Sequence, residues 1–356
     1  MVFVAQRPPV FFGRDMIFKI KIYGCLFLVV VTICAVLLIE QYVQSGPGML
    51  KEGNWQIQKP EKRVARVDGD GLFLSSSDAS KSVNIGQAVQ SQGHSFVVQL
   101  STDIRSLDVV PGVKPWDRAR LVLLQYEGKT ARYDVSHVAA TLEGTHEWEH
   151  YRKAFEIQPW ASEFRVTVQL SRCTGSLEIK NIRLYPVVVS KVYTLAQRSV
   201  LGAWGIFFVF LLGSFLVKGR YGVQGVLIVC FAGILFGAMI PGDLKTEIYG
   251  RVIVQIQLLH GMAGPEGEMI IGKIGHFCLF GILGLVLGVL MPGKSPAYIG
   301  ANILMLAGGT ELVQFFIDGR TPLFVDFLID LSGGVAGLAL VQVFMMGRRL
   351  AQVNAD

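Results

Sequence analysis

Seven polar residues in the C-terminal third of the chain lie in or beside long apolar segments. They are Lys273, His276, Glu311, Gln314, Arg320, Asp326 and Asp330. Ionisable groups within apolar spans are costly and usually face a protein interior or a wet cavity. The first four form two i,i+3 pairs and the two aspartates form an i,i+4 pair, so each pair shares one face of a helix. The spacing therefore predicts three polar helix faces that meet in a pocket or a buried network.

This set of residues combines three carboxylates, two fixed cations and a histidine. Carboxylates crowded into a low-dielectric site tend to retain a proton near neutral pH. A protonated carboxyl beside a histidine is suited to general acid–base chemistry or proton relay. Arg320 and Lys273 suggest a different role, in which they hold the phosphate of a lipid-linked glycan, because arginine binds phosphate in a bidentate manner. The excess of carboxylates argues against a polyanionic ligand unless protons or a metal intervene.

The same residues carry a family resemblance. The order and spacing of Lys273-x-x-His276-Phe277, Glu311-x-x-Gln314, Gly319-Arg320-Thr321 and Asp326, followed by a Gly-rich helix, resemble the VanZ-like membrane proteins over roughly residues 222–346. The family's characteristic residues correspond here to His276, Glu311, Gln314, Arg320 and Asp326. Asp330 stands where many members have Asn, which adds an acidic group. The resemblance implies a cell-envelope protein linked to glycopeptide resistance, notably to teicoplanin, and it supplies no mechanism.

A purely structural interpretation of these polar residues stays open. Buried Glu–Arg and Asp–His pairs can lock helices together, and polar side chains commonly bond across membrane helices. Gly333 and Gly337 form a Gly-x-x-x-Gly pair, which favours close helix packing over a ligand-binding loop. The residues thus define either a site or a network that holds three helices together.

Membrane helices must position these residues, because six segments are long and apolar enough to cross a bilayer, which takes about 20 residues. They are Ile22–Ile39, Val200–Val217, Gly222–Ile240, Ile274–Met291, Ala297–Phe316 and Phe324–Met346. The first segment has a signal-peptide-like basic flank, but its length and the lack of a small-residue cleavage site favour an uncleaved anchor. We therefore predict an anchor at 22–39 and a five-helix VanZ-like domain at 200–346.

Basic residues predict the orientation, because they collect on the cytoplasmic side of membrane proteins. They are Arg7, Arg14, Lys19, Lys21, Lys218, Arg220, Lys294, Arg348 and Arg349. If the chain crosses the membrane six times, all of these basic residues lie on the same side of the membrane. Residues 1–21 and 347–356 are therefore expected in the cytoplasm of a bacterial-type cell, and residues 42–196 outside its inner membrane. The 241–273 loop also lies outside, and its apolar stretch 252–259 is too short to span, so we expect an interfacial segment or a lid.

The segment from about 54 to 188 changes to short alternating apolar runs. Phe96–Leu100, Leu121–Leu124, Phe164–Leu170 and Leu177–Leu184 read as strands, several with the period of two that one buried face requires. Turn signals separate them, and no long amphipathic helix intervenes. The pattern predicts an all-β sandwich or jelly roll, so the fold class is a six-span α-helical membrane protein with an all-β outer domain.

The end of this segment resembles the second half of carbohydrate-binding-type jelly rolls. The resemblance rests on residues 147–155, the strand that follows them and residues 175–182. It implies that aromatic side chains stack on sugar rings. The candidates are Trp55, Trp116, Trp148, Tyr151 and Trp160. The alternative is that these aromatics belong to the core or to interfaces, since a fold analogy alone does not establish sugar binding.

The amino-acid composition excludes several classes of protein and of binding partner. Of 356 residues, 51% are hydrophobic and 17% charged, which excludes a disordered or collagenous chain. The net charge, 33 − 27 = +6, marks the cytoplasmic face and does not indicate a nucleic-acid partner. Cys173 is the single cysteine of the outer segment, so it has no disulfide partner there, and no metal-ligand spacing occurs. The sequence indicates no cofactor and no metal.

We interpret the protein as one that recognises or handles an envelope glycan or a lipid-linked precursor at the bilayer. A second hypothesis is a membrane enzyme acting on polyprenyl-linked intermediates, although the sequence has no phosphate-cradling Gly loop, nucleophile elbow or metal-ligand set. A third is a scaffold or sensor whose polar network locks helices. Transport is less favoured because no inverted repeat is evident. Whether the protein is an enzyme, and its oligomeric state, stay open at this point.

Overall fold

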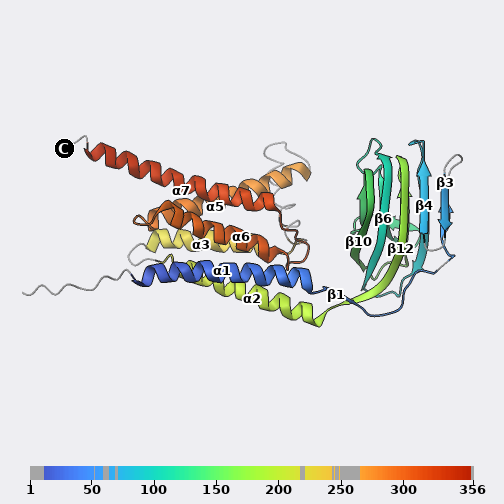
Figure 1. Cartoon of the computed structure of the whole chain (residues 1–356), viewed down its shortest axis with the longest axis horizontal. Helices are drawn as coiled ribbons and strands as arrows, with labels where there is room; N and C mark the ends of the chain where they lie inside the picture. Colours follow the sequence, from blue (N-terminus) through green and yellow to red (C-terminus); the bar gives the residue numbers. More distant parts are fainter. Residues whose placement is uncertain are drawn as a thin grey trace, which may run out of the picture. The chain divides into compact units, whose positions relative to one another are not determined.

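The computed structural model describes residues 12–51, 53–58, 64–68, 71–216, 221–242, 244, 248 and 265–353. The chain forms two compact units (Figure 1): a helical unit of Met1–Glu40 with Lys191–Asp356, and an outer unit of Gln41–Ser190. Three basic residues of the orientation argument, Arg7, Lys218 and Arg220, lie outside the described residues, as does the expected lid segment 252–259.

The helical unit is built from long apolar helices. Their bounds are Phe12–Leu38 (α1), Lys191–Gly213 (α2), Tyr221–Met239 (α3), Pro265–Leu290 (α5), Pro296–Gln314 (α6) and Phe324–Val353 (α7). By length and composition, α1, α2, α3, α5 and α7 are able to cross a membrane. These helices confirm the prediction of an α-helical membrane protein.

The predicted fifth span, 297–316, corresponds to α6, which is not among the five helices apolar enough to qualify. Among the described residues, five of the six predicted spans therefore meet this criterion, and α6 is the sixth long helix of the unit. The physical reason is that α6 buries four polar residues, Asn302, Thr310, Glu311 and Gln314. A helix enclosed by its neighbours exposes little surface to lipid, so it can be long enough to span without being uniformly apolar.

The helices also extend past the predicted spans. α1 begins at Phe12, α2 begins at Lys191, and α7 continues to Val353. The segments expected as a cytoplasmic N-terminus and tail are therefore partly helical. Hydropathy marks the apolar stretch of a helix, whereas its backbone hydrogen bonds continue through flanking polar residues until a cap or turn ends them.

Lys21, one of the basic residues used to predict the orientation, packs inside the helical unit. Its side chain is fully buried in the helical unit, where Nζ donates a hydrogen bond to Asn302 Oδ1 of α6 at 2.9 Å. The ammonium also lies 4.9 Å from the ring centroid of Phe215 and 5.7 Å from that of Tyr298. Such cation–π contacts help to stabilise a desolvated ammonium. Lys21 therefore links α1 to α6.

Glycines bring α5 and α7 into close contact (Figure 1). A Cβ at Gly337 would overlap the backbone carbonyl oxygen of Gly281, and one at Gly284 would overlap that of Gly334. The backbones can approach this closely only where side chains are absent. The prediction that Gly333 and Gly337 form a packing face is thus confirmed.

The outer unit consists of two antiparallel six-stranded sheets. The first has the order β10-β6-β12-β4-β3, visible in Figure 1, with β1 also paired to β12. These strands are Gly144–Ile157 (β10), Phe96–Val110 (β6), Thr174–Val189 (β12), Gly71–Ser76 (β4), Val64–Asp68 (β3) and Tyr42–Gln44 (β1). The second has the order β2-β5-β11-β7-β8, with β9 paired to β7. These are Gln56–Gln58 (β2), Val83–Gln90 (β5), Glu163–Leu170 (β11), Ala119–Glu127 (β7), Thr130–Arg132 (β8) and Val138–Leu142 (β9).

Alternating residues of the two sheets meet in one hydrophobic core. Leu100 and Ile104 of β6 face it, together with Phe155 of β10 and Phe164 of β11. Cys173 is fully buried in the same core as a free thiol, and burial raises its pKa to about 11. The outer unit is therefore held together by packing, and the prediction of an all-β sandwich is confirmed.

Candidate functional site

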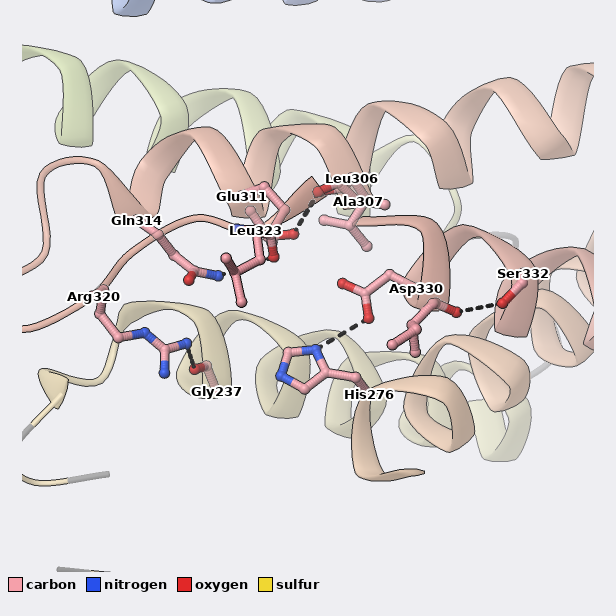
Figure 2. A network of polar contacts seen from close by, with 12 residues as sticks. Gly237, His276, Leu306, Ala307, Glu311, Gln314, Arg320, Leu323, Asp330 and Ser332 are labelled. Carbon is pink, nitrogen blue, oxygen red and sulfur yellow. Dashed lines mark hydrogen bonds and ion pairs between the residues drawn. The ribbon is translucent and has the colours of Figure 1, made fainter. Parts of the chain in front are cut away.

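His276 of α5, Glu311 and Gln314 of α6, and Asp330 of α7 converge in the helical unit (Figure 2). His276 of α5 and Asp330 of α7 are joined by a contact of 3.1 Å between Nδ1 and Oδ1. The side chain of Asp330 is only 1% exposed and that of His276 is 20% exposed. The buried carboxylate of Asp330 thus pairs with a histidine from the neighbouring helix.

Glu311 of α6 is held from two sides. Its Oε1 accepts a hydrogen bond from Gln314 Nε2 at 3.1 Å, and its Oε2 accepts one from the backbone N–H of Leu323 at 3.1 Å. The first bond realises the predicted i,i+3 pair. The second ties α6 to the chain that leads into α7. Both donors are neutral groups, so neither of these two hydrogen bonds brings a positive charge to the Glu311 carboxyl.

Asp326 and Asp330 of α7 lie close enough to Glu311 for all three carboxyls to interact electrostatically, and His276 interacts with Glu311 and Asp330 as well. The Oδ1 atom of Asp326 is buried without a hydrogen-bond partner among the described residues. An unsatisfied buried acceptor is costly, so it favours a donor such as a shared proton or a ligand group. We call these four residues and Gln314 the polar cluster.

Arg320 and Lys273 are the two cations of the predicted set. The Arg320 Nη2 atom donates to the carbonyl oxygen of Gly237 at 2.9 Å (Figure 2). Gly237 lies in the last turn of α3, where carbonyl groups lack intrahelical partners and a cation is favourable. Arg320 therefore connects the α6–α7 turn to the end of α3, while Lys273 is partly exposed on α5.

This geometry is suited to holding and sharing protons. Three carboxyl groups and an imidazole lie together on three helices, with two neutral donors fixing Glu311. Over the described part of the chain, no three His, Cys, Asp or Glu side chains are grouped as ligands for a metal ion. The carboxyl groups and the imidazole can take part in proton transfer or in hydrogen bonds to a polar ligand.

The five aromatic candidates of the outer unit do not form one stacking surface. Trp55, Tyr151 and Trp160 pack against the sandwich core, and the Tyr151 hydroxyl donates to Glu149 Oε2 at 2.8 Å. Burial and that carboxylate raise the pKa of Tyr151 to about 12. Trp148 makes cation–π contacts with Arg105 and Lys180, which lie 5.2 Å and 4.7 Å from its ring centroid. Trp116 lines a cavity of its own near β7.

A different cavity, of about 600 Å³, was missed by the sequence reasoning. Its lining includes Ser101, His150, Arg152, Asn181 and Arg183, and none of the tryptophans. These residues come from β6, β10 and β12, so no local motif joins them in the sequence. Their alternation along strands places them on one face, but the cavity itself depends on strand order and register.

The apolar helices and the antiparallel sandwich together define a multi-pass membrane protein with an all-β domain. Residues 225–345 match the family model described as VanZ/LLP1. This match runs from α3 into α7 and contains every residue of the polar cluster, which confirms the VanZ-like resemblance of this segment. None of the curated proteins compared with the chain matches it.

Solved structures similar to the chain include two carbohydrate-binding modules. The CBM22-1 xylan-binding domain of Xyn10C from Paenibacillus barcinonensis is 12% identical in sequence, with a TM-score of 0.29. The alignment covers 42% of this chain and 99% of that domain. A CBM4 structure is 12% identical, with a TM-score of 0.29, and the alignment covers 39% of this chain and 94% of that one. The enzymatically active domain of tailspike protein 4 of bacteriophage CBA120 has 12% identity and a TM-score of 0.29, with 38% of this chain and 19% of that one covered.

Proposed function

We propose that the protein acts in the cell envelope by recognising or handling a glycan or a lipid-linked precursor at the polar cluster. The observation that carries this proposal is the buried Oδ1 of Asp326, which has no hydrogen-bond partner among the described residues and lies near Glu311 and Asp330. A network that served only to lock helices would be expected to satisfy its own acceptors. A ligand hydroxyl would supply the missing donor.

The chemistry of the cluster favours hydroxyl groups over phosphate. Three carboxyl groups repel an anion, and Arg320 donates a hydrogen bond to the carbonyl of Gly237. Carboxylates and an imidazole accept hydrogen bonds well from sugar hydroxyls. We therefore assign the cluster to the glycan part of a ligand, whereas an enzyme gripping a phosphate through Arg320 is the less supported alternative.

A resistance assay tests this proposal. Expression of the unsubstituted chain in a susceptible host is expected to protect it from teicoplanin, as the VanZ-like resemblance implies. Glu311→Ala and His276→Ala are expected to abolish that protection, because each removes a group of the cluster. Membrane abundance is measured in parallel and is expected to stay unchanged. Native mass spectrometry of the purified protein would show whether a lipid-linked glycan is lost with the Glu311 carboxylate.

Asp318→Asn is the matched control for this assay. Asp318 lies in the α6–α7 turn outside the cluster, and its backbone carbonyl accepts a bond from the N–H of Gly242. The substitution removes one carboxylate at a similar place in the chain and is expected to keep full protection. A parallel loss of folded protein in Glu311→Ala would favour the structural network, and unchanged protection at normal abundance would refute the functional site.

The orientation with both termini in the cytoplasm forms part of this proposal. Lys21 of α1 and Lys294 of the α5–α6 turn are close enough to interact electrostatically, and both ammonium groups lie over the Tyr298 ring. At the other end of α6, Gln197 of α2 donates to the carbonyl of Phe316 at 2.8 Å. The two lysines therefore lie near the Tyr298 end of α6. This supports the proposal that this end is on the cytoplasmic side of the membrane, where the positive-inside rule places basic residues.

Reporter fusions check the orientation. Green fluorescent protein fused after Asp356 is expected to fluoresce, because it folds in the cytoplasm. Alkaline phosphatase is expected to be active when fused after Ser190 and inactive when fused after Asp356, since it needs the extracytoplasmic side. The reverse pattern would invert the proposed topology, and activity at both positions would contradict the assignment of α6 as a span.

A further inference from the structure

A chain of hydrogen bonds crosses the face of the first outer sheet that points away from the sandwich core. Leu100 and Ile104 of β6 are buried in the core, so the alternating residues Ser101 and Asp103 face the other way. In the strand register, His150 of β10 is paired with Asp103, and Arg152 is paired with Ser101. Directly opposite residues share a face of the sheet, which brings the four side chains together.

The contacts connect a hydroxyl, an imidazole and a carboxylate in series. The Ser101 Oγ atom lies 3.3 Å from His150 Nε2, and His150 Nδ1 lies 2.7 Å from Asp103 Oδ1. A nucleophile, a base and a group that orients the base are linked in this way in serine hydrolases. The Ser–His distance is at the long end of such contacts, which commonly tighten when substrate binds.

An irregularity in β12 fixes the third member of this chain. The register of β12 against β6 shifts between Lys180 and Arg183, and Asn181 within this bulge has a φ of 53°. A positive φ is uncommon outside glycine, although asparagine tolerates it better than most residues. The bulge turns the amide so that Asn181 Nδ2 donates to Asp103 Oδ2 at 2.7 Å. Bulges often redirect side chains in this manner beside functional sites.

The hydrogen bonds also decide which imidazole nitrogen carries the proton. Bonds from Asn181 and His150 hold the pKa of Asp103 below its usual range, so its carboxylate is ionised and only accepts. His150 Nδ1 is therefore the donor to Asp103, so Nε2 is the ring nitrogen that can accept a proton. The Ser101 hydroxyl then donates to Nε2, as a general base requires.

The hydroxyl faces space that a substrate can enter. Ser101, His150 and Asn181 line the cavity of about 600 Å³ together with Gln44 and Leu50 from the segment around β1. Arg183 lines the same cavity and is paired with Ser101 in the β12 register. A guanidinium beside the nucleophile can stabilise the negative charge that develops on a carbonyl oxygen during attack.

We propose that Ser101, His150 and Asp103 form a hydrolytic site for carboxylic esters, with Asn181 as a positioning residue. Ser101 Oγ forms a bond to the ester carbonyl carbon while its proton passes to His150 Nε2. The bond to the leaving alcohol breaks, and the alcohol takes that proton. Water then attacks the acyl-serine with His150 as base, which releases the carboxylic acid and restores Ser101. The overall reaction consumes one ester and one water and yields one acid and one alcohol.

The lining of the cavity indicates the kind of ester. Its side chains are mainly hydrogen-bonding groups, including those of Gln44, Tyr185 and Asn181, so a polar alcohol carrying a short acyl group fits better than a long acyl chain. An O-acylated sugar has this chemistry. The site is separate from the polar cluster of the helical unit, and its test is independent of the function proposed there.

A labelling experiment on the full chain in detergent tests the site. A fluorophosphonate probe, which reacts with activated serines, is expected to modify Ser101, as located by peptide mass spectrometry. p-Nitrophenyl acetate is expected to be hydrolysed with turnover. Ser101→Ala should abolish both results, and His150→Gln should slow both by about 100-fold, the lower range of general-base contributions.

Ser106→Ala and His146→Gln are matched controls from the same two strands. Ser106 Oγ donates to the Gly144 carbonyl, and His146 Nε2 contacts the Glu143 carbonyl, so neither belongs to the hydrogen-bond chain. Both variants are expected to keep labelling and turnover. Equal labelling of Ser101 in His150→Gln, no labelling of Ser101 in folded protein, or labelling without turnover would each overturn the proposal. An unchanged melting curve of each variant shows that folding is preserved.

Discussion

Gly337→Ala is expected to separate α5 from α7 and to destabilise the helical unit, although alanine is the better helix former. In an isolated helix the exchange of glycine for alanine is favourable by about 1 kcal/mol. Here the new Cβ would overlap the Gly281 carbonyl oxygen, which is backbone and has no rotamer with which to move away. The cost should therefore exceed the about 1–3 kcal/mol of ordinary overpacking. Gly284→Ala, which meets the Gly334 carbonyl, should behave alike.

The control lies in the same interface. A Cβ at Gly281 would lie 3.6 Å from the Gly333 carbonyl oxygen, an ordinary van der Waals contact. Gly281→Ala is therefore expected to be neutral or slightly stabilising. The measurement is the fraction of monodisperse protein after detergent extraction, together with its thermal unfolding midpoint. Equal behaviour of Gly281→Ala and Gly337→Ala would mean that the two helices do not pack at these glycines.

Phe164→Ala is expected to destabilise the outer unit by about 3–5 kcal/mol, the usual cost of emptying a buried phenylalanine site. The Phe164 side chain on β11 is fully buried, and its ring meets that of Phe96 edge-on at 6.1 Å. Hydrogen-bonded neighbours on both sides of β11 limit how far the strands can collapse into the cavity. With a free energy of unfolding of about 5–15 kcal/mol for an average domain, such a loss would leave a marginal fold.

Urea unfolding of the full chain in detergent, followed by the fluorescence of the outer tryptophans, measures this effect. Val113→Ala provides the control, because Val113 is fully exposed and surface substitutions usually stay within about 0.5 kcal/mol. The two variants also differ in protease sensitivity, since cleavage between residues 41 and 190 follows the unfolded population. A shift below about 1 kcal/mol for Phe164→Ala would contradict the assignment of this ring to the core.

Elements with a strong local period were predictable from the sequence. The apolar runs identify α1, α2, α3, α5 and α7, and the alternation of Phe164–Leu170 identifies β11. In both cases the signal lies within one element, because burial repeats with the period of the backbone. The helix α6 was the hard case, because it combines an apolar length with four buried polar residues whose cost is offset by contacts elsewhere in the unit.

The polar cluster was predictable in part for the same reason. The i,i+3 spacing of Glu311 and Gln314 became a hydrogen bond, and His276 and Asp330 meet across α5 and α7. His276 was expected at the end of its helix, but α5 begins at Pro265 and places it well inside. The contact of Arg320 could not be predicted, because its partner Gly237 lies on α3, 83 residues away in the chain. A spacing rule relates neighbours along one helix and says nothing about which carbonyl a long side chain reaches.

The sequence by itself determined the classes of element, the separation of a membrane part from a β part, and which polar residues the apolar helices carry. Tertiary structure alone decided that Lys21 is buried against Asn302, and that Ser101, His150 and Asp103 lie in one row. The physical reason is that periodicity fixes which face a side chain takes. Contacts between strands and helices depend instead on register, bulges and close backbone approach, and these arise when the elements pack together.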